Sequence, residues 1–215
     1  MTEILLIIIA YLIGSVSNAV WVSRRFYHLD IREYGSGNAG ATNTFRVLGP
    51  TAGTFVMILD MLKGIIAVKL ALIIPFYIEP QHLTQLINLQ IGLGLAAVIG
   101  HIFPIWYEFR GGKGIASLFG MVLAIQPLVA LCCVFVFLLM LFLTRYVSLS
   151  SIVASIAFPL LLVFIFRESE LYYKLFAISI ALMVILTHQK NISRLLTGSE
   201  NKVPLFRRGR QRRDQ

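Results

Sequence analysis

The stretch LVALCCVFVFLLMLFLT, residues 128–144, decides the fold class of this protein. It contains no charged residue, and a helix of about 20 mostly apolar residues can cross the hydrocarbon core of a bilayer. The rest of the chain shares this bias: 58% of its 215 residues are hydrophobic, 13% are charged, and the mean hydropathy is +0.81. A soluble fold needs a more polar exterior than this. The sequence therefore predicts an all-α membrane protein.

Six further apolar runs lie on either side of this stretch, at residues 3–22, 51–76, 86–106, 115–126, 148–166 and 171–187. The run at 115–126 is short for a full crossing, but Gln126-Pro127 forms a natural break before the next run. A bilayer can also thin locally around a short helix. We therefore expect a polytopic membrane helix bundle with seven transmembrane helices.

Lysine and arginine gather in alternate connections, and cytoplasmic connections are the ones enriched in these residues. They follow the first, third, fifth and seventh runs, as Arg24, Arg25, Arg32, Arg46, Arg110, Lys113, Arg145, Lys190, Arg194 and Lys202. This pattern predicts an N-terminus outside and a C-terminus in the cytoplasm. The first run has no preceding positive region, so we interpret it as an uncleaved span and not as a signal peptide.

The net charge of +9 would suggest a nucleic-acid partner in a soluble protein. Here the basic residues lie at the ends of apolar runs and in the C-terminal tail, so we expect contact with membrane lipids and no nucleic acid. We expect a single integral membrane domain over residues 1–201 and a basic cytoplasmic tail over residues 202–215. No metal-ligand spacing of His, Cys or carboxylate residues is present in the sequence, which predicts no metal.

The first polar segment is GSGNAGATN, residues 35–43, with Arg46 just beyond it. Its glycine spacing matches the dinucleotide-binding fingerprint, but that motif needs a strand before it and a βαβ unit around it. Glycines let backbone amides approach an anion, and arginine can bind phosphate through two hydrogen bonds. Taken alone, the segment fits a phosphate site and a polar turn that caps the second span about equally well.

The second polar segment is GHIFP, residues 100–104, followed by FRGGKGIAS, residues 109–117. A Walker A loop would need glycine at position 107 and Ser or Thr at 114, where this chain has Tyr107 and Gly114. Three glycines around Lys113 before a predicted helix can still bind an anion through amides, the helix dipole and an ammonium. We favour this function over a plain basic turn, and we treat His101 as supporting the site.

The third polar segment is HQKNISR, residues 188–194, with GSE at residues 198–200. His188 and Asn191 are three residues apart and would share one face of a helix. An ordinary interfacial helix end is the alternative to a functional pair.

Within the second run, Asp60 and Lys63 are also three apart, and we expect them to form a structural ion pair.

The order, spacing and residue sequence of these three segments resemble the signature motifs of the bacterial acyl-phosphate-dependent glycerol-3-phosphate acyltransferases, the PlsY family. The resemblance covers the chain up to its basic tail. Ala39 stands where many relatives have proline, and Arg110 stands where lysine is common. Neither difference removes a residue expected to bind substrate.

The resemblance implies transfer of a fatty acyl group from acyl phosphate to the 1-hydroxyl of sn-glycerol 3-phosphate. The products would be lysophosphatidic acid and phosphate, in the first step of phospholipid biosynthesis. It also implies a monomeric, cofactor-free enzyme in the bacterial inner membrane with its active site on the cytoplasmic face. A transporter of phosphorylated organic anions is the competing interpretation, but its sites usually lie near the midplane between inverted repeats.

The motifs and the resemblance together assign catalytic roles to Ser36, Lys113, His188 and Asn191. They assign substrate and phosphate binding to Gly37, Asn38, Gly40, Thr42, Asn43, Arg46, His101, Gly111, Gly112 and Gly114. Acyl phosphate is an activated donor, so positioning and charge stabilisation would supply most of the rate. The proton of the attacking hydroxyl could go to His188 or to the substrate's own phosphate.

Overall fold

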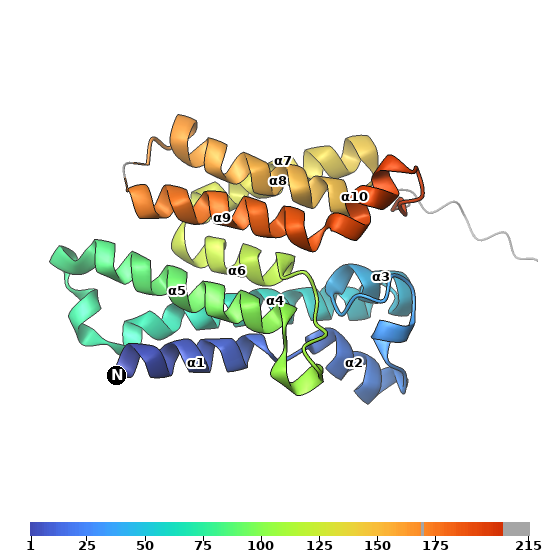
Figure 1. Ribbon diagram of the computed structural model, residues 1–215, viewed down its shortest axis with the longest axis horizontal. Helices are drawn as coiled ribbons and strands as arrows, with labels where there is room; N and C mark the ends of the chain where they lie inside the picture. The colour runs from blue at the N-terminus through green and yellow to red at the C-terminus, as the bar shows by residue number, and fades with distance from the viewer. Residues whose placement is uncertain (169, 204–215) are drawn as a thin grey trace, which may run out of the picture.

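The computed structural model describes residues 1–168 and 170–203, and every regular element within them is helical (Figure 1). The α-helices are α1 Thr2–Gly14, α2 Asn18–Tyr27, α3 Ala41–Leu48, α4 Pro50–Lys69, α5 Leu83–Ile102, α6 Ile115–Ile125, α7 Pro127–Thr144, α8 Val147–Leu160, α9 Leu171–Thr187 and α10 Gln189–Leu196. The shorter elements are η1 Ile31–Glu33, η2 Leu70–Ile73, η3 Pro75–Ile78, η4 Pro80–His82, η5 Ile105–Tyr107 and the π-helical η6 Leu161–Ile165. The predicted all-α class is confirmed. Most of the predicted basic tail, residues 204–215, lies outside the described residues.

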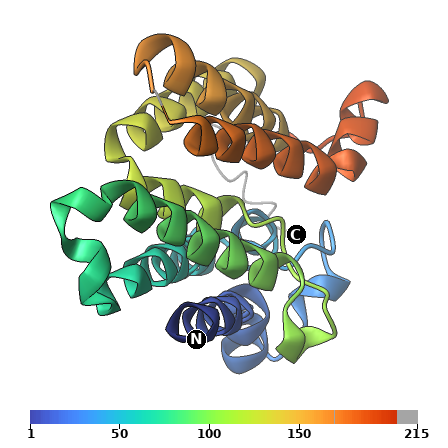
Figure 2. The same cartoon turned by 60° about the vertical axis from the view of Figure 1, so that its left-hand side comes forward.

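The long helices form two layers (Figures 1 and 2). One layer contains α1, α4, α5 and α6, and the other contains α7, α8 and α9. Within the first layer, α4 is central because it packs against α1, α3, α5 and α6. The largest buried apolar cluster joins the two layers and includes Val98, Met121, Val129, Phe158 and Phe176.

Close packing in the first layer depends on small residues. A Cβ atom added to Gly64 of α4 would lie 2.2 Å from the carbonyl oxygen of Ser117 in α6. Glycine at this position therefore lets the two backbones approach closely, as small residues commonly do between membrane helices. This contact holds the start of α6, which contains the last residues of the second polar segment, against α4.

Four described segments are long and apolar enough to cross a membrane: Thr2–Tyr27, Pro80–Tyr107, Pro127–Thr144 and Val147–Ile165. Helices α9 and α10 qualify together as a fifth, although they are bent by 62° relative to each other. Helix α6 is apolar but has 11 residues, and α4, which carries Asp60 and Lys63, is not in this set. The seven-span count remains a prediction.

Large apolar side chains cover the outer surface of α7. Phe135, Leu138, Phe142 and Leu143 are all exposed, and Phe135 retains 68% of its accessible surface. Such a continuous apolar surface is unfavourable in water. It is the surface expected of a helix whose outer face contacts lipid.

The first apolar run differs from its expected form. The sequence predicted one uninterrupted run over residues 3–22, but α1 ends at Gly14 and α2 begins at Asn18. At this break, Lys63 Nζ donates hydrogen bonds to the carbonyl oxygens of Gly14 and Val16, each at 2.9 Å. The last carbonyls of a helix lack intrahelical partners and favour a nearby cation. A side chain of α4 therefore stabilises the end of α1.

Candidate active site

The three polar segments gather at one end of the bundle, where α2, α3, α10 and the loop between α5 and α6 lie (Figure 1). The second segment contacts both of the others. Lys113 Nζ donates a hydrogen bond to Asn191 Oδ1 in the third segment. Gly112 packs so closely against the first segment that an added Cβ would lie 2.7 Å from the Ala39 carbonyl oxygen. Residues that are far apart in sequence thus form one polar cluster.

The first segment is organised around the side chain of Asn43, which is 1% exposed. Asn43 Oδ1 accepts a hydrogen bond from the backbone N–H of Ser36 at 2.8 Å. Its Nδ2 donates to the carbonyl oxygens of Ile31 and Tyr34 at 3.0 and 2.9 Å. Asn43 therefore holds the loop from beneath, and the side chain of Ser36 remains exposed.

The other predicted residues of this segment, apart from the buried Gly40, lie at or near the surface. Gly40 is the N-cap residue of α3, so the first amides of that helix follow it directly. Thr42 and Arg46, both on α3, are exposed, and Asn38 is half-buried. Gly37, also exposed, has a φ of +71°, a left-handed conformation that favours glycine. Gly37, Asn38, Thr42 and Arg46 are therefore accessible to a ligand.

The second segment forms a glycine loop, defined here as residues 111–114. It is anchored by hydrogen bonds from Gly111 N to the Ile102 carbonyl and from Gly112 N to the His101 carbonyl, both at 3.1 Å. Gly114 ends the loop with a φ of +79° and caps α6. Lys113 is the one position in the loop that carries a side chain, and this side chain is half-buried.

His101 lies beneath the glycine loop and is only 5% exposed. Its Nδ1 atom is 3.4 Å from Ser117 Oγ and 3.6 Å from Asp60 Oδ1. An added Cβ on Gly112 would lie 2.2 Å from His101 Nε2, so the other side of the ring packs against the loop. The structure therefore places His101 under the cluster of predicted ligands, where it supports the loop.

His188 follows the last residue of α9 and is 3% exposed. Its Nδ1 is 2.8 Å from the Val184 carbonyl oxygen, and because a carbonyl can only accept, we assign the proton to Nδ1. Nε2 is then a hydrogen-bond acceptor. Burial, together with the nearby charge of Lys113, lowers the pKa of His188 to about 4. The ring is neutral at physiological pH.

Both ends of the Asn191 amide are engaged. Oδ1 accepts from Lys113, and Nδ2 donates to Glu200 Oε1 at 2.9 Å. Burial lowers the pKa of Lys113 to about 8; Glu200 opposes this shift, and the positive charges of Arg194 and Arg46 add to it. The Lys113 ammonium is therefore close enough to the guanidinium groups of Arg194 and Arg46 for electrostatic repulsion between them.

Glu200 is a further member of the cluster that the assigned site residues did not include. Its carboxylate accepts from Arg194 Nε at 2.7 Å and from Ser148 Oγ at 3.1 Å, in addition to Asn191. Burial would raise the pKa of Glu200, but these hydrogen bonds outweigh it and hold the pKa below its usual value. The GSE tripeptide was visible in the sequence, but nothing in the sequence indicated that Glu200 would join α8 to α10.

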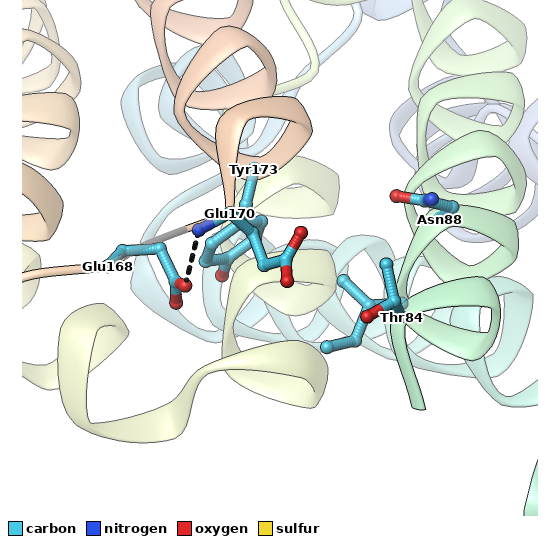
Figure 3. A pocket seen from close by; sticks show the side chains of 6 residues that line it. Thr84, Asn88, Glu168, Glu170 and Tyr173 are labelled. Atoms are coloured by element: carbon cyan, nitrogen blue, oxygen red, sulfur yellow. Dashed lines mark hydrogen bonds between the residues drawn. The ribbon is translucent and has the colours of Figure 1, made fainter. Parts of the chain in front are cut away.

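A small pocket lies at the end of α5 and α9 that is remote from the polar cluster (Figure 3), and Ile87 is among the residues that line it. Thr84, Asn88, Glu168, Glu170 and Tyr173 line it, and the Glu170 N–H donates to Glu168 Oε1 at 3.1 Å. None of the residues assigned to the site lies there. Among residues 1–168 and 170–203, no group of three or more His, Cys, Asp or Glu side chains could hold a metal ion.

Comparison with known proteins places the chain in a family. Residues 4–198 match the family model described as glycerol-3-phosphate acyltransferase. A glycerol-3-phosphate acyltransferase of Streptococcus thermophilus is 40% identical over 211 residues, which cover 95% of this chain and 94% of the relative. Glycerol-3-phosphate acyltransferase 2 of Bacillus anthracis is 44% identical over 201 residues, which cover 94% of this chain and 99% of the relative.

Two crystal structures share the fold. The glycerol 3-phosphate form of PlsY (YgiH), an integral membrane glycerol 3-phosphate acyltransferase, has a TM-score of 0.83 and 37% identity, and the alignment covers 95% of this chain and 96% of that one. The lysophosphatidic acid form of PlsY has a TM-score of 0.80 and 36% identity over the same shares of the two chains. The predicted resemblance is confirmed: this chain belongs to the glycerol-3-phosphate acyltransferase family.

Proposed function

We propose that this enzyme transfers a fatty acyl group from an acyl phosphate to the 1-hydroxyl of sn-glycerol 3-phosphate. The hydroxyl oxygen forms a bond to the acyl carbon, and the bond from that carbon to the phosphate oxygen breaks. The products are 1-acylglycerol 3-phosphate and inorganic phosphate. The observation that carries this proposal is the contact between Lys113 and Asn191, which joins the glycine loop to the third polar segment beside Arg46 and Arg194.

Phosphate recognition is the first task of this site, because both substrates carry phosphate. Lys113 and Arg46 supply positive charge, and charge-assisted hydrogen bonds to phosphate are stronger than neutral ones. Ser36 supplies a hydroxyl, and the backbone amides of Lys113 and Gly114 supply neutral donors, whereas those of Gly111 and Gly112 anchor the loop. The remaining members of the proposed binding set are Gly37, Asn38, Gly40, Thr42, Gly111, Gly112 and Gly114. Asn43 and His101, which were also predicted to bind substrate, act from beneath the loops.

The reaction needs no enzyme nucleophile, because acyl phosphate already has a good leaving group. Asn191 and His188 orient the attacking hydroxyl, and the fixed positive charges stabilise the charge that develops in the transition state. A histidine with a pKa of about 4 is a weak base. This value favours the substrate phosphate as the proton acceptor, with His188 Nε2 accepting a hydrogen bond from the hydroxyl.

We place this site at the cytoplasmic face of the bacterial inner membrane, in a seven-span domain over residues 1–201 followed by a basic tail over residues 202–215. The basic connections Arg24–Arg46 and Arg110–Lys113 lie at the site end of the bundle, which supports this orientation under the positive-inside rule. We further propose a monomer that needs no metal or other cofactor. Its acyl donor reaches the site from the lipid phase.

The test is turnover by the purified protein in lipid vesicles, supplied with palmitoyl phosphate and glycerol 3-phosphate. Release of inorganic phosphate and formation of lysophosphatidic acid should be equal and independent of nucleotide and metal. Lys113→Ala and Ser36→Ala should abolish turnover. Lys190→Ala and Ser193→Ala are matched controls, because both side chains are exposed on α10 and neither belongs to the proposed site.

Two results would contradict the proposal. Equal turnover with palmitoyl-CoA would show that the donor is wrong. Full activity of Lys113→Ala, in protein that inserts into vesicles as well as the wild type does, would show that the site is wrong. Labelling of single cysteines at positions 36, 113 and 191 from the two sides of sealed vesicles tests the orientation.

A further inference from the structure

A buried group of charged side chains lies beneath the glycine loop. Asp60 is 1% exposed, and Lys63 and His101 are each 5% exposed. Burying charged groups costs free energy unless each one is paired and hydrogen-bonded. The expected pairing of Asp60 with Lys63 is present, with Lys63 Nζ 3.1 Å from Asp60 Oδ1. This pair alone does not account for the other groups around the carboxylate.

Asp60 is the centre of this network, because one of its oxygens contacts groups from three helices. Oδ1 accepts a hydrogen bond from Asn18 Nδ2 of α2 at 2.8 Å. It also lies 3.1 Å from Lys63 Nζ of α4 and 3.6 Å from His101 Nδ1 of α5. The carboxylate therefore brings the imidazole of His101 next to groups from α2 and α4.

His101 connects this network to the glycine loop through both its ring and its backbone. The ring presents Nε2 to Gly112, where an added Cβ would lie 2.2 Å away. The His101 carbonyl accepts a hydrogen bond from Gly112 N at 3.1 Å. Gly112 is the residue before Lys113, so a rotation of the imidazole would push directly on the backbone that carries the ammonium.

We propose that Asp60 is a positioning residue for acyl transfer and acts on the reaction through His101. Its carboxylate holds the imidazole, the imidazole sets the path of the glycine loop, and the loop places Lys113 on the substrate phosphate. This inference rests on the proposed function. Asp60 itself contacts no substrate, so its removal should weaken substrate binding and leave the chemical step largely intact.

A double-mutant cycle tests this chain of contacts. Asp60→Asn, His101→Leu and the double variant are assayed in vesicles for kcat and for the KM of glycerol 3-phosphate. Each single variant should raise KM about tenfold and change kcat less than about threefold, and the double variant should also raise KM about tenfold, because residues acting as one unit are not additive. Calorimetric binding of glycerol 3-phosphate should show the same changes in Kd without turnover.

Two matched variants separate positioning from general stability. His101→Asn keeps an amide group near the position of Nδ1 and so keeps a polar partner for Asp60, but it lacks the ring atoms that face Gly112. We expect its melting temperature to stay near that of the wild type and its KM to rise about tenfold, as in His101→Leu. Val68→Ala removes part of a fully buried side chain at the other end of α4. It should lower the melting temperature and leave KM unchanged.

Two outcomes would overturn the proposal. One is a KM raised about a hundredfold in the double variant, which would show that the two substitutions act independently, and the other is a fall in kcat at constant KM. If Asp60→Asn does not fold because Lys63 loses its partner, His101→Leu and His101→Asn decide the question, since both keep the Asp60–Lys63 pair. A wild-type KM and Kd in His101→Leu would then refute it. Absence of product with the wild-type protein counts against the proposed function, whereas the calorimetric Kd values still judge the role of Asp60.

Discussion

The pKa of Lys113 leads to a prediction about pH. Burial lowers this pKa from 10.5 to about 8, against the attraction of Glu200 and with the added repulsion of Arg194 and Arg46. The shift corresponds to as much as about 3 kcal/mol in favour of the neutral amine. Only the ammonium can bind phosphate as a cation. At about pH 7 roughly nine-tenths of the free enzyme carries this charge, and at about pH 9 roughly one-tenth does.

The assay is kcat/KM for glycerol 3-phosphate between about pH 6 and pH 10, because this ratio reports ionisations of the free enzyme and substrate. We expect a descending limb with a midpoint near the Lys113 pKa of about 8. Lys113→Arg is the matched control, since a guanidinium keeps its charge throughout this range. The activity of Lys113→Arg will be lower because the planar guanidinium differs in shape from an ammonium, but its pH profile should lack the descending limb near pH 8.

As the pH rises, the stability of the protein should increase while kcat/KM falls. Between about pH 8 and pH 10.5 the unfolded chain holds a proton on Lys113 that the folded protein has lost, so stability increases with pH in this window. Thermal unfolding at each pH therefore distinguishes loss of charge from loss of structure. A flat activity profile up to about pH 10, or the same descending limb in Lys113→Arg, would refute this reasoning.

Three further predictions concern the loops and His188. Gly112→Ala should lower kcat/KM at least about tenfold, because the new methyl would lie 2.2 Å from His101 Nε2 and the loop would have to move. Asn43→Ala removes three hydrogen bonds between a buried side chain and the backbone, and it should destabilise the protein by about 2–3 kcal/mol in thermal unfolding. The pH–rate profiles of the wild type and His188→Gln should have the same acidic limb, because the pKa of His188, at about 4, lies below the assay range.

Each of these predictions can fail in a defined way. Wild-type kcat/KM in Gly112→Ala would mean that the loop tolerates a side chain against His101. An unchanged melting temperature in Asn43→Ala would mean that water replaces its hydrogen bonds at no cost. An acidic limb near pH 6.5 that disappears in His188→Gln would mean that His188 titrates during turnover.

The sequence predicted best those helices whose limits depend on local composition. The run expected at residues 128–144 is α7, Pro127–Thr144, and the run expected at residues 171–187 is α9 with the same limits. Pro127 and Arg145 bound the first run directly, and Glu170 directly precedes the second. Helix α6 ends at Ile125, one residue before the expected limit, because Gln126-Pro127 interrupts the backbone as predicted.

Features set by distant residues could not be predicted from local composition. The break between α1 and α2 is held by Lys63, which is 47 and 49 residues away from the two carbonyls it binds. The position of His101 beneath the loop depends on Asp60, and the buried carboxylate of Glu200 depends on Ser148, which is 52 residues away. The motifs identified the residues that form the polar cluster. Which of them can contact substrate, and which hold the loops in place, became clear only from the tertiary contacts.

The amide of Asn191 is hydrogen-bonded at both ends, because Lys113 donates to its oxygen and its nitrogen donates to Glu200. The Lys113 ammonium has three N–H donors, so a phosphate can bind it while the neutral Asn191 oxygen stays in place. The attraction between this ammonium and a ligand increases with the negative charge of the ligand, so a dianion binds more tightly than a monoanion or an uncharged polyol. Discrimination against glycerol and against singly charged esters can thus arise from charge at a cation that an internal partner already orients, without any steric filter.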